Sequence, residues 1–70
     1  MPLKVGDKVI YINNIAHDGN EYLLKRPSGV VRKVWLSSYT HTNMVSCQWD
    51  IPDNNFNYWN VPVSYVKLAK

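Results

Sequence analysis

The sequence predicts an all-β protein of five antiparallel strands that forms a single domain, residues 1–70. Residues with a high strand preference dominate the chain in short runs, and turn residues such as Asp18-Gly19 and Pro27-Ser28-Gly29 separate these runs. No segment has the apolar periodicity of an amphipathic helix. The hydrophobic fraction of 46% and the aromatic fraction of 13% are sufficient for a folded core.

Alternation of apolar and polar residues is clearest in the middle of the chain. There Val45, Cys47 and Trp49 are expected to face the core, whereas Ser46 and Gln48 face the other way. Pro62 cannot donate to a ladder, so it ends the fourth strand, and one 3₁₀ turn at 62–65 is expected before the last strand. Residues 21–25 have the composition of a further short strand. The five expected strands cover residues 8–12, 30–36, 44–50, 56–61 and 66–68.

Three segments of the chain resemble a known fold family. Val5-Gly6-Asp7-Lys8-Val9 resembles the strand entry of Tudor, KOW and other Src-homology-3-like small barrels, and residues 44–50 are similar to their central strand. Residues 61–68 resemble the closing segment of true Src-homology-3 domains, where a proline opens a 3₁₀ turn and a tyrosine precedes the last strand. The resemblance implies a five-stranded Src-homology-3-like small barrel. The aromatic first strand and the adjacent tryptophans of true Src-homology-3 domains are missing, so polyproline binding is not implied.

A basic cluster flanks the predicted turn at 27–29, in a chain of net charge +3. Between Glu21 and Asp50 there is no acidic residue. If residues 21–25 paired with residues 30–36, the cations on the two sides would become neighbours, although like charges facing one another in a sheet are destabilising. A nucleic-acid backbone is the obvious counterpart of such a cluster, so the expected partner is nucleic acid or a nucleoprotein machine. The expected phosphate-binding residues are Lys25, Arg26, Arg32 and Lys33, with base stacking by Tyr22, Trp35 or Tyr39 if these rings are exposed.

The sequence is also compatible with two alternatives to nucleic-acid binding. The basic residues can instead form a solvated face that protects an edge strand from aggregation. The late aromatic residues Tyr58, Trp59 and Tyr65 can form a groove for a protein partner, or the partner can add a strand to a sheet edge. On that hypothesis the chain is an accessory or inhibitory protein. The other interpretation of these rings is that they only close the core.

Catalysis is not expected, because Cys47 lies in the inward phase of its strand and a buried thiol is a poor nucleophile. The two histidines, His17 and His41, are distant from each other and from Cys47, so no metal site is expected. The three glycines are too far apart for a phosphate loop, and no cofactor is expected. A single cysteine favours a reducing compartment, the cytoplasm. No stretch approaches the roughly 20 apolar residues that cross a bilayer, so no membrane partner is expected.

Overall fold

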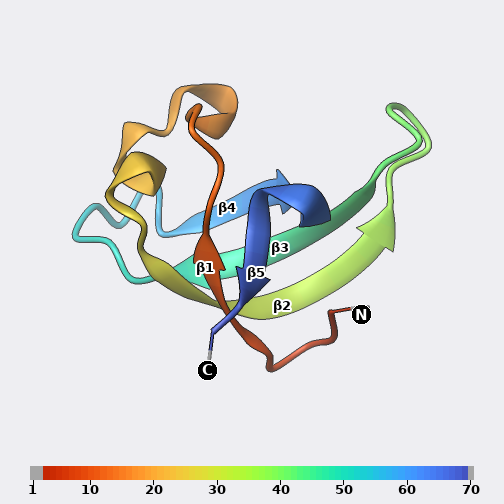
Figure 1. The fold of residues 1–70 in the computed structure, drawn as a ribbon, viewed down its shortest axis with the longest axis horizontal. Helices are drawn as coiled ribbons and strands as arrows, with labels where there is room; N and C mark the ends of the chain where they lie inside the picture. The colour runs from red at the N-terminus through yellow and green to blue at the C-terminus, as the bar shows by residue number, and fades with distance from the viewer. Residues whose placement is uncertain (1–2, 70) are drawn as a thin grey trace.

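The computed structural model describes residues 3–69 and confirms an all-β fold with five antiparallel strands. Within these residues every helical segment is a short 3₁₀ turn, and one of them precedes the last strand as predicted (Figure 1). The strands are β1 (Lys8–Tyr11), β2 (Ser28–Leu36), β3 (Asn43–Trp49), β4 (Tyr58–Pro62) and β5 (Val66–Leu68). The 3₁₀ turns are η1 (His17–Gly19), η2 (Glu21–Lys25) and η3 (Val63–Tyr65).

All five strands belong to one antiparallel sheet with the order β4-β3-β2-β1-β5. The two edge strands, β4 and β5, do not pair within residues 3–69, so the sheet is not closed into a barrel. In Figure 1, β1 and β5 lie across the long ribbon formed by β2 and β3. The central strands therefore have a core face, which is covered by the rest of the chain, and an opposite outer face.

The core face contains the buried apolar side chains. Val45, Cys47 and Trp49 are all buried, which confirms the alternation predicted for this strand. Cys47 lies opposite Val31 on β2 and opposite Trp59 on β4, so these three residues share the core face. The buried apolar residues are Val9, Tyr11, Leu23, Val31, Val45, Cys47, Trp49, Val61 and Val66.

The expected short strand at 21–25 is wrong, because these residues form the 3₁₀ turn η2. Buried Asn20 caps the N-terminus of η2: its side-chain oxygen accepts from the Tyr22 N–H, and its side-chain amide nitrogen donates to the carbonyl of Phe56 in the β3–β4 connection. Leu23 is fully buried beneath the turn. The strand β2 then begins at Ser28, two residues earlier than expected, and pairs with β1 and β3 only.

The hairpin formed by β2 and β3 extends beyond the core, as Figure 1 shows. Its loop is closed by a hydrogen bond from the Ser37 N–H to the Thr42 carbonyl. Side chains near its end are highly exposed, Leu36 at 64% and Tyr39 at 94%. The register of this hairpin shifts between Val31 and Lys33, where β2 contains a bulge. Among residues 3–69, no helix has the length and apolar character needed to span a membrane.

Candidate nucleic-acid interface

The four cations of the predicted basic cluster do not come together. The hairpin that would have joined them is absent, because residues 21–25 form η2 and are not a strand beside β2. Arg26 instead binds the loop that follows β1: its guanidinium donates to the carbonyl of Asn13 at 2.7 Å and to the side-chain oxygen of Asn14 at 2.8 Å. A longer contact of 3.4 Å reaches the carbonyl of Tyr11. Arg26 is therefore engaged in holding the loop in place.

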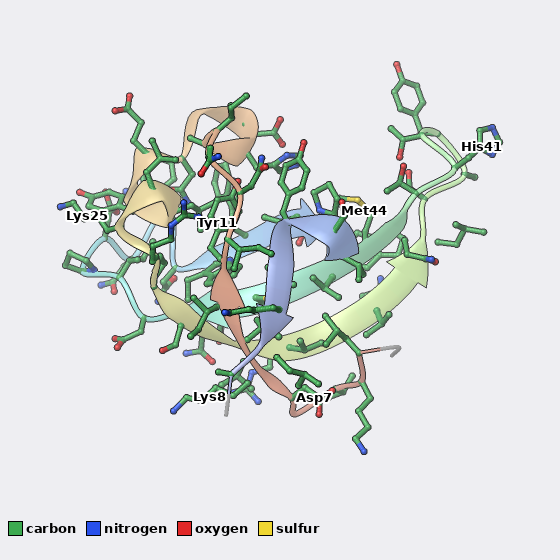
Figure 2. All side chains as sticks on the ribbon, viewed as in Figure 1. Asp7, Lys8, Tyr11, Lys25, His41 and Met44 are labelled. Atoms are coloured by element: carbon green, nitrogen blue, oxygen red, sulfur yellow. The ribbon has the colours of Figure 1, made fainter. Side chains whose placement is uncertain are left out.

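Lys25 lies on η2, separate from the cations of β2. Its ammonium group is 5.6 Å from the centroid of the Tyr22 ring, and it lines a hollow of about 370 Å³ with Tyr22 and Phe56. Figure 2 shows Lys25 at one side of the molecule and His41, in the hairpin loop, at the other. Of the four predicted residues, the structure thus brings together only Arg32 and Lys33, which are neighbours on β2.

The outer face of β2, β3 and β4 consists of three cross-strand rows. The residues in these rows lie on the side of the sheet opposite to the core, and none of them is fully buried. No aspartate or glutamate occurs on any of the three strands. Read from the hairpin end, the rows are Trp35–Met44–Pro62, Lys33–Ser46–Asn60 and Val30–Gln48–Tyr58.

Three cations belong to this outer face. Arg32, at the bulge, donates to the side-chain oxygen of Gln48 at 2.9 and 3.3 Å, which holds its guanidinium over β3. The ammonium of Lys33 lies 5.4 Å from the centroid of the Trp35 ring. Lys8 pairs with Val30 across β1 and β2, and it lines a hollow of about 470 Å³ together with Arg32 and Gln48.

Two acidic residues border this group: Asp7, which directly precedes Lys8 in the chain, and Asp50, which follows β3 and lines the same hollow as Lys8 and Arg32. No ion pair joins either carboxylate to Lys8 or to Arg32, so the two cations keep their charge available for a ligand. The outer face therefore combines positive charge, hydrogen-bonding groups and rings on one surface.

The three predicted partner-binding aromatics do not form a common groove. Tyr58 is on the outer face and is 58% exposed, whereas Trp59 alternates to the core face. The Trp59 indole N–H donates to the His17 carbonyl at 2.9 Å. Tyr65 packs edge-on against Tyr11 at 6.2 Å and against His17 at 5.6 Å. Trp59 and Tyr65 therefore help to close the core.

Several residues of the outer face were not predicted as part of a site, among them Lys8, Gln48, Met44 and Pro62. Alternation from Val45 already places Met44 on the same face as Ser46 and Gln48, and this signal could have identified it. Pro62 gives no such signal, because its place beside Met44 follows from the β3–β4 register.

The thiol of Cys47 does not form a reactive site. The side chain is fully buried, as predicted, and burial raises its pKa from 9.0 to about 12. The thiolate, which is the nucleophilic form, is therefore scarce near neutral pH.

Comparison of the chain with protein-family models, with curated proteins and with solved structures found no match.

Proposed function

We propose that this chain is a non-catalytic binding module that attaches to nucleic acid through the outer face of β2, β3 and β4. The single observation that carries the proposal is the charge distribution: Arg32 and Lys33 of β2, with Lys8 beside them on β1, border a face whose strands β2, β3 and β4 contain no acid. A Src-homology-3-like assignment is supported by the pairing of β1 with β5 and by the turn η3 before β5.

A phosphate backbone matches this face in charge and in hydrogen bonding. Each phosphate neutralised by a lysine or arginine releases condensed counterions, which favours association at low salt. The Arg32 guanidinium is already oriented by Gln48, so it loses less freedom when it binds a phosphate. Ser46 and Asn60 add neutral hydrogen-bonding groups that can contact phosphates or base edges.

The alternative of a protein partner loses support from the positions of its aromatic residues. Trp59 and Tyr65 make contacts within the fold, and of the three only Tyr58 projects from an open face. The proposed function therefore uses Tyr58 and Trp35 as the rings that meet the ligand. A cytoplasmic location is compatible with the free, buried thiol of Cys47.

The experiment is a titration of labelled nucleic acid, both a short duplex and a single strand, at several salt concentrations. The test variant is Arg32→Gln/Lys33→Gln, and the matched control is Lys25→Gln on η2. Saturable binding by the wild type is expected at low salt. On a duplex, losing two phosphate contacts should reduce the slope of log K against log salt by about 1.8. The control should keep the wild-type slope.

Two results would contradict the proposal. If the wild type shows no saturable binding at low salt, where these contacts are strongest, nucleic acid is not the ligand and the protein-partner hypothesis replaces it. If Lys25→Gln lowers the slope as much as the double variant, the ligand does not lie on the outer face. The substituted side chains are exposed, so stability should change by less than about 0.5 kcal/mol.

A further inference from the structure

One row of the outer face differs in character from the other two. Trp35, Met44 and Pro62 are direct cross-strand neighbours on β2, β3 and β4, and together they form a continuous apolar row near the hairpin end. The next row, Lys33–Ser46–Asn60, is entirely polar. All three side chains of the apolar row remain partly exposed.

From this row we infer that the ligand is double-stranded DNA and that Trp35, Met44 and Pro62 enter a base-pair step from the minor groove. The inference rests on the proposed function, because it concerns the same face, and it adds the class of nucleic acid and the mode of contact. Proteins that bind in the minor groove often insert apolar side chains, methionine and proline among them, between base pairs and so kink the duplex.

The width of the face prevents the whole sheet from entering either groove, of which the minor is the narrower at about 6 Å. Neighbouring strands lie about 4.8 Å apart, so the three strand axes span about 10 Å before any side chain is added. The major groove is about 12 Å wide and admits a helix or a two-stranded ribbon. A three-stranded face is too broad to enter it, and a sheet can instead lie against a minor groove that the inserted row opens.

The spacing of the rings disfavours a single strand. Binding without a duplex depends on several rings that stack successive bases. Among the rows of the outer face, the rings that reach solvent are Trp35, which is partly exposed, and Tyr58; they lie on different strands and two rows apart, about 13 Å along the strand direction. Tyr39, at 94% exposed, lies in the hairpin loop and belongs to none of the three rows. Trp35 and Tyr58 therefore do not form a continuous stacking platform.

The cations are arranged to support the apolar row. Lys33 lies one row away, about 7 Å along the strand, where it can reach the phosphates that border an opened step. Arg32 and Lys8 lie further along the same face and can reach the next phosphates. Met44 and Pro62 carry no side-chain hydrogen-bond donor, so they suit DNA better than the hydroxyl-lined minor groove of an RNA duplex.

The test is unwinding of DNA by the bound protein. Nicked circular DNA is closed by a ligase at increasing concentrations of protein, and the linking number of the product is measured after the protein is removed. The wild type should lower the linking number in proportion to the protein bound. A fluorescence energy transfer measurement on an end-labelled duplex should show a kink, most strongly at flexible pyrimidine–purine steps.

The test variant is Met44→Gln, which keeps the length of the side chain and removes its apolar character. We expect the unwinding per bound protein to fall at least twofold, whereas the salt dependence of binding is unchanged because the cations remain. The matched control is Leu36→Ala, an exposed apolar residue on the same hairpin that pairs with Asn43 outside the row. This control should unwind DNA as the wild type does, and circular dichroism checks that both variants are folded.

The outcomes separate this inference from the proposed function. If no nucleic acid binds, the proposed function fails. If a single strand or an RNA duplex binds more tightly than DNA, or if DNA binds with no change in linking number, the inference is wrong and the proposed function stands. Equal unwinding by Met44→Gln and the wild type would also overturn the role of the apolar row.

Discussion

Replacement of Gly29 by alanine tests the packing that fixes β2 against β3. Gly29 lies directly opposite Trp49, and a Cβ atom at Gly29 would be 2.7 Å from Cε3, 3.0 Å from Cδ2 and 3.1 Å from Cζ3 of that ring. Trp49 is only 2% exposed, packs edge-on against Tyr11 at 6.0 Å, and donates its indole N–H to the Trp59 carbonyl at 3.2 Å. The ring therefore cannot move aside without disturbing other contacts.

The cost of Gly29→Ala follows from these distances. Carbon atoms pack best at about 3.5–4.0 Å, so the ring or the strand must shift by roughly 1 Å. Overpacking of a close-packed core destabilises by about 1–3 kcal/mol. Alanine offsets about 0.5–1 kcal/mol of this loss, because it has less conformational entropy than glycine in the unfolded chain. We expect a net loss of about 1–2 kcal/mol, which lowers Tm by about 5–15 °C for a domain of this size.

The assay is urea unfolding followed by tryptophan fluorescence and by far-ultraviolet circular dichroism. The control is Ser28→Ala, the adjacent residue of β2, whose Cα partner on β1 is Ile10. This control should unfold within about 0.5 kcal/mol of the wild type. Equal or greater stability of Gly29→Ala would refute the close contact between Gly29 and Trp49 and, with it, the register assigned to β2 and β3.

The remaining predictions concern a loop and a buried thiol. Arg26→Gln should destabilise the fold by about 1–2 kcal/mol and increase amide hydrogen exchange in residues 12–16, because the carbonyls that Arg26 binds lose a charged donor. Cys47→Ala should lower the free energy of unfolding by about 1 kcal/mol or somewhat more, because the buried side chain loses packing contacts. A thiol reagent should label the wild type only as fast as the protein unfolds. Rapid labelling would show that Cys47 is exposed. Burial raises the pKa of the Cys47 thiol in the fold to about 12, whereas in the unfolded chain the thiol loses its proton above about pH 9. The free energy of unfolding should therefore fall as pH rises from 9 to 12. The Cys47→Ala variant should show a shallower fall, and a residual decline is expected from Tyr11, whose pKa burial also raises.

Local patterns in the sequence predicted the strands whose faces differ in polarity. The alternation around Cys47 gave the correct core face of β3, and Pro62 correctly indicated a 3₁₀ turn before the last strand. The segment at 21–25 was mispredicted because Tyr22, Leu23 and Leu24 suit a strand or a turn equally well by composition. Contacts distant in sequence decide the outcome, namely the bond from Asn20 to Phe56 and the burial of Leu23.

The site could be predicted less well than the fold, and the bulge in β2 explains why. Alternation counted from buried Val31 would turn Lys33 and Trp35 toward the core, because a strand repeats every two residues. The bulge between Val31 and Lys33 shifts the register by one residue and moves both side chains to the outer face. Pairing of Arg32 with Gln48, and of Met44 with Pro62, likewise depends on the register between strands, which local sequence does not reveal.

The three tryptophans provide a direct measurement of where a nucleic acid binds. Trp35 lies on the outer face, whereas the indole N–H groups of Trp49 and Trp59 donate to carbonyls of Trp59 and His17 within the fold. The three indole resonances are followed in a proton–nitrogen correlation spectrum of the labelled protein during titration with a short DNA duplex, and single Trp→Phe variants provide their assignment. Binding at the outer face predicts that the Trp35 resonance shifts or broadens in proportion to saturation while the other two hardly move. An unchanged Trp35 resonance at saturation, or a larger shift at Trp59, would contradict the proposed site.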